Sequence, residues 1–552
     1  MGAVNDQRDS AAKAVLLTLT VAQFVMILDA SVMNVSIATV ASDLGTTVTG
    51  IQTAITMYTL VMAALMITGG RMGAILGRKR AFTIGCVIYA CGSLTTALSP
   101  NLGVLLFGWS FLEGVGAALV LPAIVSLVAS NFEKAARPKA YGTVAVGGAI
   151  AVAVGPLIGG LFTTYWSWRY VFVGEVLILG IVLLLNRRTA DTPAEEGARL
   201  DLVGTGLSAL GLGLIVYGVL RMGTWGVVLP KPGAPTWLGL SPVIWLILAG
   251  GAVLFAFLAW EAHQRDTGRP ALLDPVILRV KLFRKGLVAF FFQYLLQAGL
   301  FFAVPLFLSV VLGLSAIDTG VRILPLSITL VIAALGIPKL FPTASPRRIC
   351  RLGFLALFLG LVAFVAALDA GAGPEIVTWP MLLAGLGIGM LASQLGAVTV
   401  SALPDEKSGD VGGLQNTFSN LGISIGTALA GAVLLSVLTS SFISGIQSNP
   451  AVPKDLSSKA QVELTSGVPF ISDADLKAAL QDAGLTGATA TAVVDENAKA
   501  RLDALRASLS VLAVLAMVAL FFSGSLPTTP AGGDAVNTDS PTREPRARAP
   551  TE

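Results

Sequence analysis

Fourteen apolar stretches of the chain are each long enough to cross a lipid bilayer as a helix. A helix rises about 1.5 Å per residue and the hydrocarbon core is about 30 Å thick, so about 20 apolar residues make one crossing. The stretches lie near residues 15–38, 51–70, 81–98, 104–128, 141–163, 170–186, 202–220, 243–261, 287–312, 321–340, 352–369, 379–401, 411–438 and 508–524. Charged residues make up only 12% of the chain, whereas roughly 25% is usual in a soluble protein. The sequence therefore predicts an all-α, multi-pass membrane protein.

The basic residues indicate how the chain is oriented. An even number of spans places both termini on the same side of the membrane. If that side is the cytoplasm, most of the 36 Lys and Arg residues fall in cytoplasmic segments, and the short external connections carry few. Cytoplasmic loops of membrane proteins are enriched in these residues. We therefore expect both termini to be cytoplasmic.

A weak internal repeat suggests two similar halves. Shifting the sequence by 268 residues aligns Gly70–Arg80 with Pro338–Arg348 without a gap. Two packed halves around a central site give alternating access in transporters. The expected organisation is a six-helix half (1–188), two inserted helices with a cytoplasmic linker (189–285), a second six-helix half (286–524) and a disordered cytoplasmic tail (525–552).

The second half includes one long external segment, residues 439–507. Ser472 followed by Asp475 predicts a helix start, and Gly484 predicts its end. A second helix is expected from about Thr489 into the last span. The segment is either a simple connector or a cap over an external vestibule.

Several classes of protein are excluded or disfavoured. The chain has no P-loop motif, so an ATP site is not expected. One histidine, His263, and three cysteines disfavour a metal site. The sequence has no nucleophile motif that would indicate an enzyme, and it implies no cofactor. The net charge of +4 is too small to indicate nucleic-acid binding. A channel remains a second class, although no filter motif or charged ring is evident.

A basic loop joins the second and third spans. Its glycines permit a tight turn, and its cations can pair with acids or helix C-termini, or simply anchor the loop in the cytoplasm. The residues concerned are Gly70, Arg71, Gly77, Arg78, Lys79 and Arg80.

The fifth span contains the sequence GAIAVAVGPLIGG, residues 148–160. Pro156 removes a helical hydrogen bond, while Gly155, Gly159 and Gly160 let another backbone approach closely. Small-residue packing without any role in transport is the alternative interpretation.

Together with residues 28–35 (LDASVMNV) and 166–169 (WSWR), these motifs resemble the fourteen-span drug:proton antiporter family of the major facilitator superfamily, which includes quaternary-ammonium and multidrug exporters. The resemblance implies the major-facilitator fold, two six-helix halves plus two inserted helices. The sequence departs from the family pattern at Ala74, where the family has an acid. It also departs at Ser110 and Glu113, near which many members of the family have Arg and Gln.

Two acids, Asp29 and Glu113, lie near the middle of predicted spans. An intramembrane carboxylate costs about 2.5 to 3.5 kcal/mol on insertion scales, so such residues usually have a function. In this superfamily the first and fourth helices line the central cavity, so the resemblance brings both acids to one water-filled space. Burial and a neighbouring acid both favour the protonated form, which suits proton coupling. The alternative is a buried carboxyl that only bonds a neighbouring helix.

Other residues are weaker candidates. Trp109 is expected to form an apolar wall beside Glu113, and Glu175, about six residues from the external boundary at Arg169, is expected to have a vestibule role or none. Candidates for substrate contact are Met26, Met33, Trp109, Gln293, Gln297, Asn416 and Asn420, and for all of these except Trp109 helix packing is an equally good explanation.

The resemblance thus predicts a monomeric, proton-coupled exporter of drugs or amphiphilic, often cationic, small molecules in the inner (plasma) membrane of a bacterium. An exporter of a lipid or endogenous metabolite and a proton-coupled nutrient importer remain alternatives.

Overall fold

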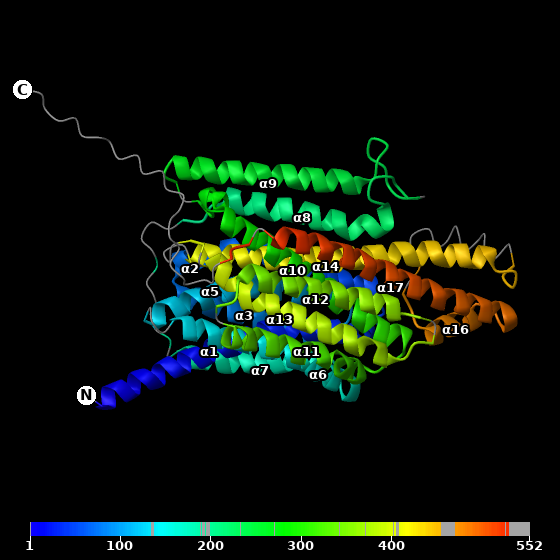
Figure 1. Cartoon of the computed structure of the whole chain (residues 1–552), viewed down its shortest axis with the longest axis horizontal. Coiled ribbons are helices and arrows are strands. Elements are labelled where there is room, and N and C mark those ends of the chain that lie inside the picture. Colours follow the sequence, from blue (N-terminus) through cyan, green and yellow to red (C-terminus); the bar gives the residue numbers. More distant parts are fainter. Residues whose placement is uncertain are drawn as a thin grey trace, which may run out of the picture.

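Long helices running side by side account for most of the molecule (Figure 1). The computed structural model describes residues 2–133, 137–187, 189, 194, 199–231, 233–269, 271–341, 343–369, 371–400, 402–403, 408–453, 468, 470–524 and 526–528. The elements are α1 (Gly2–Asp43), α2 (Val48–Leu76), α3 (Arg78–Ala97), α4 (Leu102–Leu105), η1 (Leu106–Glu113), α5 (Gly114–Asn131), α6 (Arg137–Tyr165), α7 (Arg169–Asn186), α8 (Leu202–Trp225), α9 (Pro242–Asp266), η2 (Pro275–Arg279), α10 (Lys281–Leu306), η3 (Phe307–Val311), α11 (Ala316–Leu340), α12 (Pro346–Ala367), η4 (Pro374–Val377), α13 (Thr378–Val400), α14 (Ser408–Ser448), α16 (Asp473–Asp482) and α17 (Gly487–Ser523).

Each of the fourteen predicted spans is helical, so the all-α prediction is confirmed. Among the described residues, 13 helices are long and apolar enough to cross a membrane. Of the fourteen predicted spans, the one outside this set is α3, which starts with three cations and is rich in Gly, Ser and Thr. It nevertheless packs inside the bundle, against α5 and α7.

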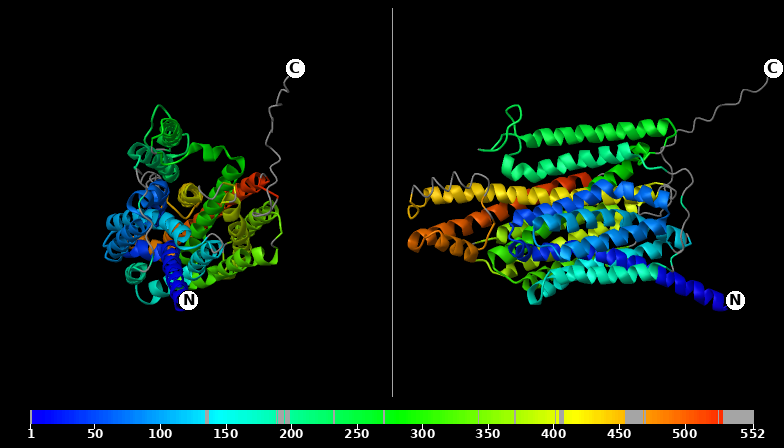
Figure 2. Two further views of the ribbon diagram at one scale, coloured as in Figure 1. Left: turned by 90° about the vertical axis from the view of Figure 1, so that its left-hand side faces the viewer. Right: turned by 180° about the vertical axis from the view of Figure 1, so that it is seen from behind.

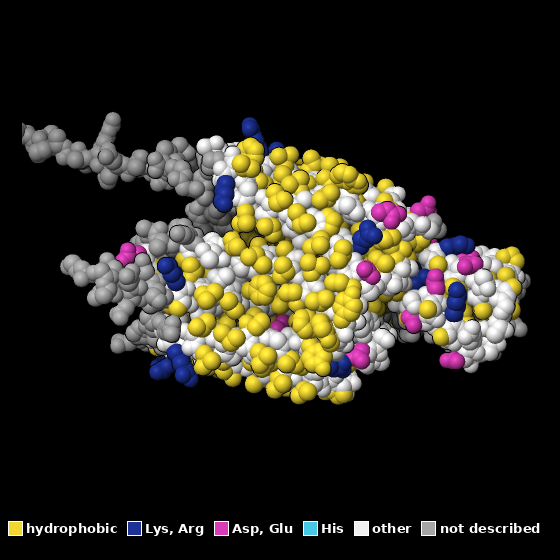
Figure 3. Space-filling model, turned by 90° about the horizontal axis from the view of Figure 1, so that it is seen from below, with side chains coloured by type: hydrophobic (Ala, Val, Ile, Leu, Met, Phe, Trp, Pro, Cys, Tyr) yellow, Lys and Arg dark blue, Asp and Glu magenta, His cyan; other side chains and the backbone are white. Residues whose placement is uncertain are grey.

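The surface has the pattern of a protein embedded in lipid. Hydrophobic side chains cover the flank of the bundle, and charged side chains gather toward its two ends (Figure 3). Large apolar residues such as Phe255 and Trp379 are each 75% exposed there. An apolar surface of this extent is not expected to face water.

The two inserted helices lie at the edge of the bundle (Figures 1 and 2). Helix α8 packs against α9 on one side and against α2 and α14 on the other. The α8–α9 loop is attached to α14 by Lys231, whose Nζ donates to the Ser436 hydroxyl at 2.8 Å. Partial burial lowers the pKa of the Lys231 ammonium.

The external segment forms a helical extension at the end of the bundle opposite the N-terminus (Figure 1). Helix α14 continues to Ser448, ten residues past the expected end of its span. The Ser472 hydroxyl caps α16 by accepting from the Asp475 amide, and the chain turns at Gly484 with φ of +75°. The predicted start and end of α16, and the predicted helix that runs into the last span, are therefore confirmed. Residues 529–552 of the predicted tail lie outside the described residues.

Candidate functional site

Three carboxyl groups meet among the first six predicted spans. Asp29 comes from α1, Glu113 from the end of η1 and Glu175 from α7, and one carboxylate oxygen of each lies within 4.8 Å of the others. The three side chains are 0%, 0% and 1% exposed. We call these residues the carboxyl cluster.

Helix α3 supplies one hydroxyl group to each member of the carboxyl cluster. The donors Tyr89, Ser93 and Thr96 are spaced four and three residues apart, so they share one helix face. Their hydroxyl groups lie 3.0 Å from Asp29, 3.1 Å from Glu175 and 3.0 Å from Glu113, respectively. Three of the polar residues of α3 thus contact the acids.

Asp29 receives additional hydrogen bonds from Trp109. The indole Nε1 lies 2.8 Å from each oxygen of the Asp29 carboxylate. The ring of Trp109 stacks on Tyr58 of α2, with centroids 5.2 Å apart and planes 8° apart. The sequence predicts that Trp109 forms an apolar wall and contacts substrate, and its N–H donor is the feature that the sequence interpretation missed.

Local backbone features bring Glu113 to this position. The fourth span contains a π-helical segment, η1, which ends at Glu113, and such segments occur often at functional sites. Across from it, a Cβ atom at Gly92 would lie 2.5 Å from Glu113 Cγ. Position 92 therefore requires glycine for the glutamate side chain to pack against α3.

The cluster is suited to bind protons or one small cation. In the described part of the chain, no Lys, Arg or His donates a hydrogen bond or forms an ion pair with any of the three acids. Three negative charges at this separation in a buried site repel one another strongly. Positive charge must therefore be bound with them, and a proton is the smallest source of it.

The position of Glu175 corrects the sequence-based expectation. Glu175 was expected to reach water near the external boundary, but it points inward and contacts the Ser93 hydroxyl. Distance along α7 alone could not indicate this, because the direction of the side chain depends on α3. The polar face of Tyr89, Ser93 and Thr96 was the available signal.

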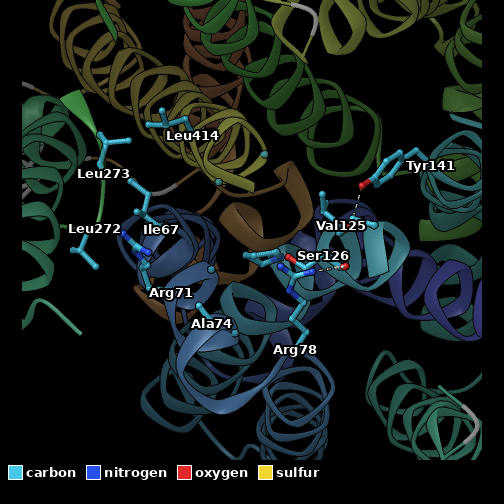
Figure 4. A pocket seen from close by; sticks show the side chains of 16 residues that line it. Ile67, Arg71, Ala74, Arg78, Val125, Ser126, Tyr141, Leu272, Leu273 and Leu414 are labelled. Carbon is cyan, nitrogen blue, oxygen red and sulfur yellow. Dashed lines mark hydrogen bonds between the residues drawn. The ribbon is translucent and has the colours of Figure 1, made fainter. Parts of the chain in front are cut away.

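A cavity of about 320 Å³ lies near the end of the bundle that carries the N-terminus (Figure 4). Its walls come from α2, the start of α3, α5, α6, α14 and the linker after α9. We call it the cleft. The residues lining it are Ile67, Gly70, Arg71, Gly73, Ala74, Arg78, Pro122, Val125, Ser126, Ala129, Tyr141, Leu272, Leu273, Gly412, Gly413 and Leu414.

The basic loop at the mouth of the cleft binds backbone carbonyl groups. Gly77 has φ of +92°, which permits the sharp turn between α2 and α3. Arg71 donates from Nε and Nη2 to the Ala271 carbonyl, with 3.0 Å from Nε. Arg78 reaches the Ser126 carbonyl at 3.5 Å.

Lys79 donates to the carbonyl groups of Arg187 and Thr189, at 3.2 and 2.7 Å, beside the C-terminus of α7. A cation is favourable at this end of a helix dipole. Arg80 is exposed. At the position where relatives have an acid, Ala74 lines the cleft.

The glycines of the fifth span allow close contacts with two other helices. Cβ atoms at Gly155 and Gly159 would lie 2.4 Å from Ser31 Cβ and 2.9 Å from Val32 Cα, both in α1. A Cβ atom at Gly160 would lie 2.5 Å from the Ala316 carbonyl oxygen of α11. The motif therefore packs α6 against both predicted halves.

Contacts between α6 and α11 are reciprocal. A Cβ atom at Gly320 would lie 2.4 Å from the Pro156 carbonyl oxygen, and the Ile317 amide donates to the Thr164 hydroxyl at 3.0 Å. These backbones touch at the end of the bundle opposite the N-terminus. We call this contact the outer gate, a name that takes the orientation and the role proposed below.

Helices α2 and α14 close the same end of the molecule. Gln52 Nε2 donates to the carbonyl groups of Thr427 and Ala428, at 3.0 and 3.3 Å, and the Ser424 hydroxyl donates to the Thr56 carbonyl at 3.0 Å. The two predicted halves are thus held together at the outer end and separated by the cleft at the other.

A recess of about 450 Å³ lies near the outer end, between the end of α1 and the start of α11. Its lining residues and those of the cleft include no member of the carboxyl cluster. In this conformation the three acids are enclosed by protein. They do not line the water-filled space that the resemblance predicted.

The remaining candidates lie elsewhere in the bundle. Met26, Met33 and Gln293 are buried, and Gln297 is half-buried. Asn416 and Asn420 donate to carbonyl groups of their own helix, Gly412 and Asn416. None of these residues lines the cleft in this conformation.

Known proteins resemble the chain over most of its length. The profile of the Major Facilitator Superfamily matches residues 19–427. The probable actinorhodin transporter of Streptomyces coelicolor is 28% identical over 471 residues, covering 82% of this chain and 76% of the relative. The puromycin resistance protein of Streptomyces alboniger is 30% identical over 452 residues, covering 80% and 85%.

Solved structures share the fold. A bacterial homologue of the human lysosomal transporter Spinster, in an inward-facing and unoccupied conformation, matches with a TM-score of 0.57 at 15% identity. The match covers 94% of this chain and 98% of that one. With its helical bundle and a family profile that spans most of its length, the chain belongs to the Major Facilitator Superfamily.

Proposed function

We propose that this protein exports drug-like small molecules in exchange for protons. The relatives are named for resistance to puromycin and for transport of actinorhodin, which supports an antibiotic or similar amphiphile as the substrate. Asp29 and Glu113 are the proposed proton-coupling residues. The proton gradient is the energy source, and neither a cofactor nor ATP takes part.

The observation that carries this proposal is the separation of the carboxyl cluster from the cleft. A molecule entering the cleft does not touch the acids, which are fully buried. Coupling therefore requires a change of conformation. This change exposes the acids to water on one side of the membrane and opens the substrate site on the other side. Two packed halves that rock about a central site provide such a change.

The outer gate and the basic loop are the proposed moving contacts. Opening to the outside requires separation of α6 from α11 and of α2 from α14. Closing the cleft brings the loop 70–80 toward the N-terminal end of α14. Membrane potential contributes about 2.3 kcal/mol per charge per 100 mV to an exchange that moves net charge.

The lining of the cleft bears on the substrate. It includes Arg71 and Arg78 and, among the described residues, no acid. Such a lining attracts neutral or anionic amphiphiles at least as well as cations, so the proposed substrate range is wider than the cationic compounds expected from the sequence.

The proposed location is the inner membrane of a bacterium, with both termini in the cytoplasm and the cleft open to it. The apolar flank of the bundle would face the lipid bilayer (Figure 3). The protein is proposed to act as a monomer, because each step above uses residues of one chain.

Inside-out membrane vesicles provide the test. We expect puromycin to dissipate a pre-formed, acid-inside proton gradient in vesicles that contain the protein, and Asp29→Asn to abolish this response. Asp482→Asn, an exposed acid in α16, is the matched control and should respond like the wild type. Normal proton exchange in both Asp29→Asn and Glu113→Gln would refute the assignment of these residues.

A further inference from the structure

We propose that Glu175 is a third proton-binding group of the coupling site, and that the carboxyl cluster exchanges two protons for each molecule exported. Asp29 stays ionised in the conformation described, while Glu113 and Glu175 each carry a proton. The inference rests on the proposed proton-driven export and adds a residue and a stoichiometry to it.

The first argument is the unequal distribution of hydrogen bonds. Both oxygens of Asp29 accept a bond from Trp109, and one also accepts from Tyr89. In contrast, Glu113 Oε2 and Glu175 Oε1 are buried and have no hydrogen-bond partner. A buried oxygen left without a donor is more costly in an ionised carboxylate than in a neutral, protonated carboxyl. The donors therefore match an ionised Asp29 and two protonated glutamates.

The second argument comes from the single hydroxyl proton of Thr96. Its Oγ1 lies 2.9 Å from the Gly92 carbonyl oxygen and 3.0 Å from Glu113 Oε1. One proton makes a strong bond to only one of these acceptors. If the hydroxyl donates to Gly92 within α3, the contact with Glu113 is favourable only when the glutamate carries a proton and donates to Thr96.

Tyr58 is a further polar group beside the carboxyl cluster. Among the described residues, its buried hydroxyl group has no hydrogen-bond partner. Stacking on Trp109 fixes the ring in this position. A hydroxyl can accept from a protonated glutamate and donate to a carboxylate, so Tyr58 is placed to complete the network once protons are present.

The charge balance also requires more than one proton. The groups that face the cluster are Tyr58 of α2, Trp109 of η1, and Tyr89, Ser93 and Thr96 of α3, and none of them is cationic. Three ionised carboxyls would carry a charge of about −3 in a buried site, where like charges cannot all remain ionised. Two bound protons reduce this to −1, which the two donors to Asp29, the Trp109 N–H and the Tyr89 hydroxyl, can stabilise.

Both protons follow one route in the proposed cycle. When the outer gate is open, Glu113 and Glu175 take protons from external water, and the substrate leaves. When the cleft is open and the site becomes hydrated, the same two O–H bonds release their protons to cytoplasmic water, and new substrate binds. The two glutamates thus alternate between protonated and ionised forms, while Asp29 holds the negative charge that attracts the protons.

Infrared spectroscopy of the purified full-length protein at pH 7 tests the protonation states without a substrate. The carbonyl stretch of a protonated carboxyl is separate from the carboxylate bands. We expect Glu113→Gln and Glu175→Gln each to remove one such band, and Asp29→Asn to remove none. Glu375→Gln, an exposed glutamate in η4, is the control and should leave the bands unchanged.

Glu175→Asp is a second variant in case Glu175→Gln does not fold. It should keep the number of bands and shift one of them. A spectrum of Glu175→Gln, or of Glu175→Asp if only that variant folds, that is identical to the wild type would overturn the proposal. Loss of a band in Glu175→Gln supports it even where puromycin is not exported, and in that case only the proposed function fails.

Accumulation in proteoliposomes tests the stoichiometry. The membrane potential is held at zero, the pH gradient is one unit, and uptake of radiolabelled puromycin is corrected with protein-free vesicles. Two protons per molecule sustain about a 100-fold gradient and one proton about a 10-fold gradient. We expect about 100-fold for the wild type and about 10-fold for Glu175→Gln. A wild-type limit of about 10-fold would refute exchange of two protons.

Discussion

The indole nitrogen of Trp109 lies 2.8 Å from both carboxylate oxygens of Asp29, so one N–H group is shared by the two oxygens. Trp109 belongs to the fourth span and Asp29 to the first. The bond thus joins the first and fourth spans. From the sequence, contact between these two spans could be expected only from the resemblance to the superfamily. It also stabilises the ionised form of Asp29, because a donor favours the charged state of its acceptor.

We expect Trp109→Phe to shift the pH dependence of export to higher pH by about one to two units. Phenylalanine keeps a ring against Tyr58 but has no donor, and a hydrogen bond to a charged group contributes about 1.5–3 kcal/mol. Without it, Asp29 is protonated up to a higher pH and loses the negative charge that the proposed cycle needs, so export requires more alkaline conditions. The measurement is the rate of puromycin export in vesicles as a function of pH.

Trp168→Phe is the matched control for this shift. Trp168 is also buried, and its Nε1 donates to Asp43 at 2.9 Å, at the outer end of α1. The variant loses the same kind of bond away from the carboxyl cluster, and its pH profile should match that of the wild type. Equal shifts in both variants would mean that the Trp109 bond has no specific effect on proton release.

We expect Gly160→Ala to open the outer gate. The added Cβ would lie 2.5 Å from the Ala316 carbonyl oxygen, a backbone atom, so α11 must move away. Overpacking of this kind costs about 1–3 kcal/mol, which shifts a two-state equilibrium about 5- to 150-fold. Ser36 is buried below the gate, bonded to Thr163, so a Ser36→Cys reporter in a chain without Cys86, Cys91 and Cys350 should react faster with an impermeant maleimide added outside.

Gly174→Ala serves as the control for the outer gate. Gly174 lies in α7, and a Cβ atom there meets nothing within 4 Å. Its reporter should react at the wild-type rate. Unchanged labelling in Gly160→Ala would show that the α6–α11 contact does not limit access from outside.

The spans and the two mid-membrane acids could be predicted from the sequence because each depends on local information. The length of an apolar run decides whether it crosses a bilayer, and an acid inside such a run is costly wherever it points. Asp29 and Glu113 could therefore be recognised without knowledge of their neighbours. The side chains meet as the resemblance implied, although their role stays a prediction.

The rest of the site depends on contacts between distant segments. Glu175 could not be assigned from its distance to Arg169, because Ser93 of another helix sets its direction. Trp109 was interpreted by its ring and not by its N–H group. Gly160 was expected to permit a close approach, but its partner, Ala316, lies in the other predicted half.

We expect Gln52→Leu to weaken the outer closure in the same direction as Gly160→Ala but by less. The variant loses two bonds to carbonyl groups that α14 already satisfies within its own helix, at a cost of about 0.5–1.5 kcal/mol. Labelling of the Ser36→Cys reporter should rise about 2- to 13-fold. Thr53→Val, which loses only a bond to Thr49 of its own helix, should not change it.

We expect Arg71→Ala to release the linker that follows α9. Arg71 holds the Ala271 carbonyl, and Leu272 and Leu273 are each only 3% exposed. Loss of about 1 kcal/mol of binding should make a Leu273→Cys reporter react about fivefold faster with a thiol reagent in inside-out vesicles. Arg80→Ala removes an exposed cation of the same loop and should leave the rate unchanged. Equal rates in the two variants would contradict a role for Arg71 in holding the linker.

We expect Arg501→Met to destabilise the external extension. Arg501 is 1% exposed, donates to the carbonyl groups of Val310 and Ile471 at 3.2 and 2.9 Å, and forms an ion pair with Asp473. Methionine fills much of the space but leaves two carbonyl groups without this donor, at a cost of about 1–3 kcal/mol. The measurement is thermal unfolding of the purified protein in detergent. Lys499→Met removes an exposed cation from the same helix, whose pair with Glu496 is worth about 1 kcal/mol or less. Equal midpoints for the two variants would show that Arg501 does not anchor α17 to η3 and α16.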